Sequence, residues 1–258
     1  MSNSFKESFE KTRLAGIIAA GALDEVAKIV KPGIQTAEID NLCYEYLNDH
    51  GAYSAPLYYR GFPKSCCTST NHVVCHGIPS NKILKEGDIV NVDVTVILNG
   101  WYGDSSRMFV AGQTNKKNYN FLKLTYESLL AGIEEAKPGN HIGDIGNKIQ
   151  NLAESNGYSV VRDFCGHGIG KEFHTPPSVL HFGEPGEGPK LEPGMFITIE
   201  PMINLGGWQT KILNDGWTAV TKDKSLSAQF EHTIGITEYG NEVFTLSKNN
   251  TAFPIKDV

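Results

Sequence analysis

The chain has few cysteines, and their arrangement argues against a disulfide framework and against a structural zinc site. The five cysteines are odd in number and lack paired metal-ligand spacing. Cys66 and Cys67 are adjacent, which is a poor geometry for an ordinary structural disulfide. We therefore expect five reduced thiols and a cytoplasmic protein.

Long hydrophobic runs and surplus positive charge are also missing. No apolar run reaches membrane-spanning length, and the N-terminal segment lacks the apolar core of a secretory signal. The net charge of -6 leaves no excess of Lys and Arg to neutralise phosphates, so no nucleic-acid partner and no membrane partner are expected. No Pro/Gly/Ser-rich linker divides the 258 residues, which favours one domain over residues 1–258.

The chain does contain a repeated order of motifs. KPGIQTAEIDN is echoed by KPGNHIGDIGN, and LKEGDIVNVD is echoed by LEPGMFITIE at almost the same offset. Two matches in the same order indicate an internal structural repeat, with halves of about residues 1–118 and 119–250. The second alignment places Asp93 opposite Glu200, so each half carries an acid at the end of a strand pattern.

The coarse order of elements predicts an α+β fold. Apolar periodicity predicts helices over about residues 5–30, from Thr36 as a cap, over 119–135 and over 141–156, each pair being followed by strands. Because helices and strands do not alternate strictly, a central antiparallel sheet with flanking helices fits better than a doubly wound parallel sheet.

The stretch NVDVTVILNGWYGDSSRMF combines a hairpin signal with two acids. Asn99-Gly100 predicts a two-residue turn, which pairs Thr95 with Asp104. Alternation then places Asp93 and Asp104 on one face as diagonal neighbours, close enough to share a cation. Taken alone, a solvated sheet face with two unrelated acids explains the hairpin equally well.

The second half supplies further candidates of the same kind. Glu200 and Glu231 each occupy a polar position within a strand pattern, and His167 lies in the glycine-rich CGHGIG. Taken singly, each of these residues could be a solvated strand or turn residue with no part in binding. Together with Asp93 and Asp104 they offer four carboxylates and one imidazole, whose charge two divalent ions would balance. Such a ligand set suits Mn, Fe, Co or Zn, and a pair of these ions generates hydroxide and polarises carbonyls.

The motifs VDVT…GDSSRMF, CGHGIG, FHTPP, TIEPM, DGWTAVTKD and SAQFEHTI, in this order, resemble type I methionine aminopeptidases, the bacterial form. The resemblance covers about residues 5–250. It implies the pita-bread fold, with two pseudo-symmetric halves and a dinuclear metal site. It also implies removal of the initiator methionine from deformylated nascent proteins whose second residue is small and uncharged. A hydroxide bridging two divalent metals would attack the methionine carbonyl.

The resemblance also assigns roles to particular residues. Asp104 and Glu231 would bridge the metals, Asp93 would bind one ion, and His167 and Glu200 would bind the other. Glu200 would also shuttle a proton. His76 would lie beside the scissile nitrogen, and His174 would stabilise the tetrahedral intermediate. The remaining substrate-binding residues would form the methionine pocket: Tyr59, Phe62, Cys67, Phe173 and Trp217. Without the resemblance, the two histidines would be interpreted as structural residues in turns, and the aromatic residues as part of the hydrophobic core.

Two residues depart from the family pattern near this pocket. Arg60 stands where the family often has histidine, and Pro56 stands where bacterial relatives can carry cysteine. The partners that the resemblance implies are N-terminal methionine peptides and the ribosome, with a monomer as the expected state. Alternatives are another pita-bread exopeptidase such as a proline aminopeptidase, a non-catalytic binding module, or acids that stabilise the sheet with calcium.

Overall fold

The computed structural model describes residues 3–248, 253 and 255. Residues 1–2 and 249–250 of the two predicted halves lie outside this range. The helices of the described part are α1 (Asn3–Ile29), α2 (Thr36–Asp49), α3 (Lys116–Glu135) and α4 (Ile142–Ser155), with a short 3-10 turn η1 (Tyr59–Gly61). None of the helices in these residues has the length and apolar character needed to cross a membrane.

The strands form one large sheet and two small ones. The strands are β1 (Tyr53–Ser54), β2 (Cys67–Thr70), β3 (Val73–Cys75), β4 (Ile89–Leu98), β5 (Trp101–Val110), β6 (Ser159–Val160), β7 (Gly166–Gly168), β8 (Thr175–Val179), β9 (Phe196–Ile199), β10 (Met202–Asn204), β11 (Thr210–Ile212), β12 (Ala219–Thr221), β13 (Ser227–Gln229), β14 (Glu231–Ile236) and β15 (Asn241–Val243). The nine-stranded sheet has the order β1-β4-β5-β14-β9-β7-β8, with β2 paired to β4 and β15 paired to β14. The smaller sheets are β13-β10-β6 and β11-β12-β3.

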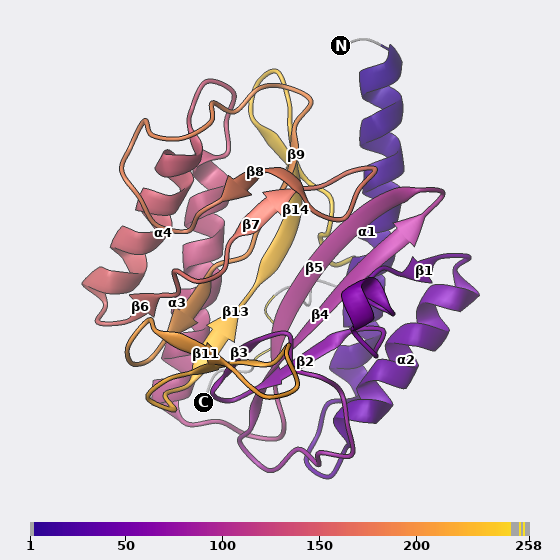
Figure 1. Ribbon diagram of the computed structural model, residues 1–258, viewed down its shortest axis with the longest axis vertical. Helices are drawn as coiled ribbons and strands as arrows, with labels where there is room; N and C mark the ends of the chain where they lie inside the picture. Colours follow the sequence, from indigo (N-terminus) through magenta and orange to yellow (C-terminus); the bar gives the residue numbers. More distant parts are fainter. Residues whose placement is uncertain (1–2, 249–252, 254, 256–258) are drawn as a thin grey trace.

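Each pair of helices covers its own part of the large sheet. Figure 1 shows α1 and α2 on one side of the molecule and α3 and α4 on the other. One hydrophobic cluster joins α1 and α2 to the valines of β4, and a second joins α3 and α4 to β9 and β14. The predicted α+β class, with a central antiparallel sheet and flanking helices, is confirmed.

The long hairpin has the predicted register. Thr95 is paired with Asp104, and the turn residues Asn99 and Gly100 both have positive φ, as a tight two-residue turn requires. The predicted cap of the second helix is wrong. Gln35 occupies the N-cap position, while the Thr36 hydroxyl donates to the Ser80 carbonyl oxygen at 3.1 Å. Capping propensity placed the cap at Thr36, one residue after the observed one. The Thr36 hydroxyl is engaged in a tertiary hydrogen bond instead.

The helices α2 and α4 occupy matching places in the two predicted halves. Each has 14 residues and begins with a capping box, in which the Glu38 carboxylate accepts from the Gln35 backbone and that of Asp144 from the His141 backbone. The glycines of the two KPG motifs also donate equivalent backbone hydrogen bonds, Gly33 to Leu84 and Gly139 to Leu191. These equivalences support the internal repeat, which stays a prediction.

A buried ion pair ties α1 to β5. The Arg107 guanidinium donates to the Asp24 carboxylate at 2.6 Å and to the Ala20 carbonyl oxygen at 3.1 Å. Ser247 donates to the same carboxylate at 2.7 Å. The Arg107 and Asp24 side chains are only 1% and 4% exposed. Since Arg107 lies on the strand that carries Asp104, this pair helps to hold that strand against the helix layer.

Loss of the Asp24 carboxylate should therefore destabilise the fold strongly. We expect Asp24→Ala to lower the free energy of unfolding by about 3–5 kcal/mol, because the Arg107 charge stays buried without its partner. Urea denaturation followed by circular dichroism measures the change. Glu25→Ala on the same helix is the matched control, since Glu25 pairs with Lys28 at the surface and its loss should cost about 1 kcal/mol or less. Equal shifts for the two variants would contradict the anchoring role of Asp24.

Candidate metal centre and substrate cavity

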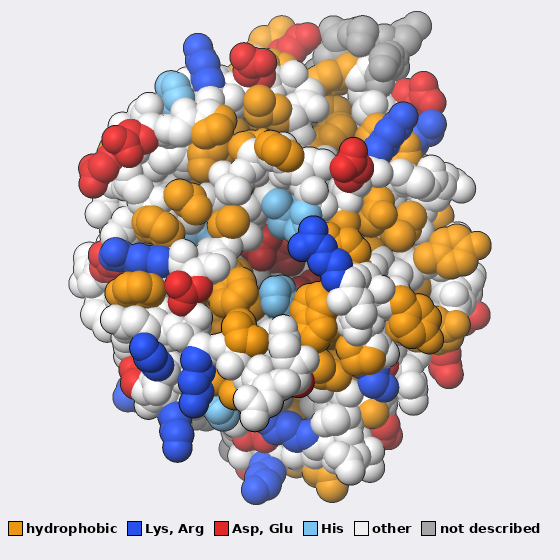
Figure 2. All heavy atoms as spheres, in the orientation of Figure 1, with side chains coloured by type: hydrophobic (Ala, Val, Ile, Leu, Met, Phe, Trp, Pro, Cys, Tyr) orange, Lys and Arg blue, Asp and Glu red, His pale blue; other side chains and the backbone are white. Residues whose placement is uncertain are grey.

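A single cavity gathers every site residue that the sequence predicted. It has a volume of about 630 Å³. Figure 2 shows it as a hollow with acidic side chains at its floor, and with histidine, hydrophobic and basic side chains around it. The predicted residues that line it are Tyr59, Phe62, Cys67, His76, Asp93, Asp104, His167, Phe173, His174, Glu200, Trp217 and Glu231.

Neighbouring strands of the large sheet each contribute one of the five predicted ligands. Following the order β4-β5-β14-β9-β7, the contributions are Asp93, Asp104, Glu231, Glu200 immediately after β9, and His167. Asp93 and Glu231 both lie opposite Ser106 of β5, one on each side. Residues in register across antiparallel strands share a face. The sheet therefore lines up acids that lie far apart in the sequence on one face.

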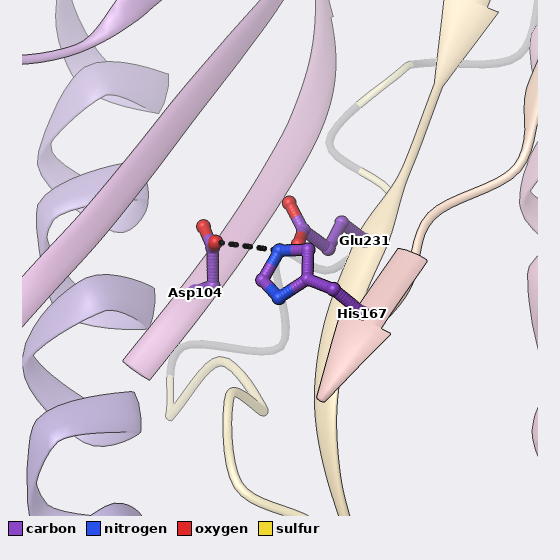
Figure 3. Close-up of side chains that lie close together, drawn as sticks. All are labelled: Asp104, His167 and Glu231. Atoms are coloured by element: carbon purple, nitrogen blue, oxygen red, sulfur yellow. Dashed lines mark ion pairs between the residues drawn. The ribbon is translucent and has the colours of Figure 1, made fainter. Parts of the chain in front are cut away.

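The side chains of Asp104, His167 and Glu231 converge on a common point. One ligand atom from each lies within 4.8 Å of the others, and Figure 3 shows the three side chains pointing toward one another. His167 Nε2 is 3.7 Å from Asp104 Oδ2 and 3.7 Å from Glu200 Oε1. Asp93 lies diagonally across the β4-β5 pair from Asp104, and its charge raises the pKa of Asp104.

The glycines around His167 allow its strand to approach its neighbours closely. A side chain at Gly166 would place a Cβ 2.4 Å from the Thr198 carbonyl oxygen, and one at Gly168 would place it 2.3 Å from that of Pro176. The His167 Nδ1 lies 3.0 Å from the Gly168 carbonyl oxygen, which only accepts. Nδ1 therefore carries the proton, and Nε2 presents its lone pair to the carboxylates.

Burial of the four carboxyl groups raises their pKa values. Desolvation raises the pKa of Asp93 to about 7 and that of Glu200 to about 8. It also raises the pKa of Asp104 and of Glu231 well above the ordinary range, and the neighbouring carboxylates add to both shifts. Within the described residues, no Lys or Arg forms an ion pair with any of the four.

This donor set fits divalent metal ions. The buried carboxylates of Asp104 and Glu231, the partly buried ones of Asp93 and Glu200 and the lone pair of a neutral imidazole line one cavity, and protons or cations relieve their repulsion. The separations of 3.7 Å from His167 Nε2 to two carboxylate oxygens exceed hydrogen-bonding distance. Oxygen donors with one nitrogen suit first-row divalent metals.

Several supporting residues were missed as functional residues in the sequence. The Thr95 hydroxyl donates to Asp104 at 2.8 Å, and the Thr198 hydroxyl donates to Glu200 at 2.7 Å. The Gln229 amide donates to the other Glu200 oxygen at 3.2 Å. Alternation along the strands could have suggested these three, because each shares the polar face of the acids.

His181 had no comparable signal in the sequence. It lies between β8 and β9 and is 1% exposed, and its Nε2 accepts a hydrogen bond from the Glu200 backbone at 3.0 Å. Burial lowers the pKa of His181 to about 3, so the imidazole is neutral. It fixes the backbone at the point where Glu200 leaves the strand.

The two remaining histidines of the prediction lie on the cavity wall as neutral imidazoles. Burial lowers the pKa of His76, whose ring packs edge-on against Trp217 at 6.1 Å. Desolvation and then the neighbouring His167 lower the pKa of His174 to about 3. His174 Nδ1 is 3.2 Å from the Tyr59 hydroxyl. The His174 and His167 rings lie 4.3 Å apart, so His174 is next to the proposed ligands.

The predicted pocket residues form aromatic pairs beside this centre. The Phe62 and Trp217 rings are 5.2 Å apart, and the Tyr59 and Phe173 rings are 4.9 Å apart. Cys67 lies opposite Asp93 in the β2-β4 register, which places a thiol beside the carboxylates. The departures Arg60 and Pro56 also line the cavity. All five cysteines are free thiols in the structure.

Known proteins match the chain over nearly its full length. A model for metallopeptidase family M24 matches residues 10–238. A methionine aminopeptidase from Rickettsia prowazekii (strain Madrid E) is 54% identical over 250 residues, which cover 96% of each chain. A crystal structure of methionine aminopeptidase from Rickettsia prowazekii has a TM-score of 0.92 and 55% identity, and the match covers 93% of this chain and 98% of that one.

A more distant relative supports the fold alone. A prolidase from Pyrococcus furiosus has a TM-score of 0.74 at 24% identity, and the match covers 94% of this chain and 65% of that chain. These structural likenesses confirm the pita-bread fold that the resemblance implied.

The raised carboxyl pKa values predict an unusual pH dependence for the metal-free protein. The pKa is about 7 for Asp93 and about 8 for Glu200 in the folded state, against about 4 for such groups in the unfolded chain. At a pH between these values, the folded state therefore holds protons that the unfolded chain has released. Stability should therefore fall as pH rises from 5 to 8, by about 1.4 kcal/mol per pH unit for each retained proton. Urea denaturation of chelated protein at a series of pH values measures the slope.

Two comparisons make this test specific. Asp104→Asn removes one of the mutually repelling charges and should flatten the slope. Saturating divalent metal should raise the stability most at pH 8, because the ions replace the retained protons. A chelated protein whose stability is constant or rises between pH 5 and 8 would show that these carboxyl groups do not titrate as a buried cluster.

Proposed function

The chain belongs to metallopeptidase family M24, and from this premise we infer that it is a metal-dependent aminopeptidase that removes the N-terminal methionine from polypeptides. The observation that carries this function is the cavity itself. Its floor is a centre of four carboxylates and one imidazole, and its wall is an aromatic pocket beside that centre. The centre of acids and histidine suits metal-assisted hydrolysis of an amide bond. The aromatic pocket suits an apolar side chain next to the bond that is cleaved.

We propose that five residues hold two divalent ions. Four carboxylates carry four negative charges, which two such ions balance. Asp104 and Glu231 would bridge them, Asp93 would complete one site, and His167 and Glu200 would complete the other. Co, Mn, Fe and Zn all suit this set of donors. When bound, the ions lower the pKa of water to near neutrality and polarise the substrate carbonyl.

The surrounding residues would hold and move protons during the reaction. The Glu200 oxygens accept from Thr198 and Gln229, and we propose that this carboxylate accepts and passes on a proton beside the ions. His174, with Nδ1 at the Tyr59 hydroxyl, would direct Nε2 toward the developing oxyanion. His76 would contact the nitrogen of the departing amine.

The aromatic side of the cavity would select the first residue of the substrate. Tyr59, Phe62, Cys67, Phe173 and Trp217 provide polarizable, mostly apolar surface that suits a thioether chain. The free amino group would lie at the Asp93 side of the centre. We propose that the second residue must be small and uncharged and that a formyl group must already be absent.

The cellular setting belongs to the same proposal. The substrates would be nascent chains, met in the cytoplasm and near the ribosome, and the protein would act as a monomer. Equilibrium sedimentation of the metal-loaded protein, and cosedimentation with ribosomes, are the measurements that test these expectations.

The ligand set predicts the effect of removing either bridging acid. Asp104→Asn or Glu231→Gln should lower turnover of Met-Ala-Ser by at least about 10²-fold and lower the bound metal below two ions per chain. Methionine release and elemental analysis measure the two effects. Glu127→Gln on α3 is the matched control, because Glu127 is exposed and pairs only with Lys123. Near-normal activity of either ligand variant would refute the bridging role.

The aromatic pocket predicts a preference that separates this function from its main alternative. The metal-loaded protein should release methionine from Met-Ala-Ser and leave Xaa-Pro peptides almost uncleaved. Chelation should stop the reaction, and added divalent metal should restore it. Faster cleavage of Xaa-Pro peptides would favour the proline-specific exopeptidase instead, and metal binding without cleavage of either would favour a binding module.

A further inference from the structure

Arg60 is the one basic side chain that lines the cavity within the described residues. It is exposed, and its guanidinium lies 5.3 Å from the centre of the Tyr59 ring. It forms no ion pair with a carboxylate of the described part of the chain. A stacked guanidinium without an anionic partner keeps its hydrogen-bond donors available to another molecule.

The backbone around Arg60 holds the side chain at this position. Tyr58 and Arg60 both have positive φ, of 66° and 48°, and the Tyr58 amide donates to the Phe62 carbonyl oxygen at 2.7 Å. Tyr59, on which the guanidinium lies, also contacts His174 through its hydroxyl and packs 4.9 Å from Phe173. Arg60 is therefore fixed to the same aromatic wall as the proposed methionine pocket, on its solvent side.

The direction of the substrate follows from the cavity. The acidic centre and the aromatic pocket take the first residue, so the rest of the polypeptide must leave toward solvent, where Arg60 is exposed. The other exposed charged residue of the lining, Asp163, accepts two hydrogen bonds from Thr210, at 3.2 Å from its backbone nitrogen and 2.6 Å from its hydroxyl. Arg60 is thus the available charge on the exit path.

We propose that Arg60 is a specificity-determining residue that binds an acidic side chain of the substrate just downstream of its second residue. This inference rests on the proposed aminopeptidase function. A guanidinium matches a carboxylate in two parallel hydrogen bonds and repels a lysine at the same position. The third to fifth residues of the substrate are the positions that leave the cavity beside it.

The experiment compares peptides that differ only in charge. The substrates are Met-Ala-Asp-Ser-Ser, Met-Ala-Ser-Ser-Ser and Met-Ala-Lys-Ser-Ser, with a second series that moves the charged residue to the fourth and fifth positions. All are amidated, so that no terminal carboxylate competes for Arg60. Methionine release by the metal-loaded protein gives kcat/KM for each peptide, and the ratio of the Asp value to the Lys value is the readout.

The variants separate a specific contact from a general charge effect. Arg60→Gln should lower the Asp-to-Lys ratio by about threefold or more at low salt, mainly through KM. Arg60→Glu should reverse the preference, and Arg60→Lys should keep part of it. Lys171→Gln removes the same charge from an exposed residue that stacks on Trp101 and does not line the cavity, so it should keep the wild-type ratio. Salt at 1 M should reduce the wild-type preference.

The outcomes have distinct meanings. If the Asp-to-Lys ratio changes equally in Arg60→Gln and Lys171→Gln, the role of Arg60 is overturned. It is also overturned if the ratio changes in neither variant at any of the three positions. A uniform loss of rate on all peptides in Arg60→Gln and Arg60→Glu, with the ratio preserved, also overturns it, because that pattern belongs to a purely structural residue. Failure of the wild-type, metal-loaded protein to release methionine from any peptide overturns the proposed function and the Arg60 role together.

Discussion

The repulsion among four carboxyl groups with little access to water is the constraint on which the rest of the structure depends. Asp93, Asp104, Glu200 and Glu231 lie on one face of neighbouring strands, and burial raises the pKa of each. Protons or divalent ions must balance this charge, since no Lys or Arg among the described residues pairs with it and the pKa of His167 is lowered by burial. Cations relieve the repulsion between these acids, so their close placement favours metal binding.

The surrounding scaffold holds this unfavourable arrangement in place. Two helix pairs with separate hydrophobic clusters cover the two parts of the sheet, and the buried contact between Arg107 and Asp24 joins the layers next to the strand of Asp104. Close to the acids, hydroxyl and amide donors orient the carboxylate oxygens, and His181 fixes the backbone of Glu200. The stability of the helix layers thus supports the precise placement of like charges.

The cavity also has an order from floor to mouth that suits an exopeptidase. The charged centre lies beside an aromatic wall in the same cavity, where His174 lies next to His167 and His76 packs against Trp217. Arg60 extends the same wall to the solvent. A polypeptide end that enters this cavity passes Arg60 at the mouth and reaches the aromatic wall and the charged centre, which leaves the following residues beside Arg60.

The sequence by itself determined the local geometry. The Asn-Gly turn and the alternation of side chains were enough to predict the hairpin register and to place Asp93 and Asp104 on one face. These signals suffice because they act between residues that are neighbours along the chain or across one tight turn. The assignment of His76, His174 and the pocket aromatics came from family resemblance, since their local patterns suit turns or a core equally well.

Only the tertiary structure decided which strands lie side by side. The order β4-β5-β14-β9-β7 joins segments from both predicted halves through long-range pairing, and this pairing makes one centre out of five separate residues. It also placed His181 against Glu200 and turned the Thr36 hydroxyl away from its helix toward Ser80. Such contacts depend on packing between distant segments, so no periodicity or local propensity encodes them.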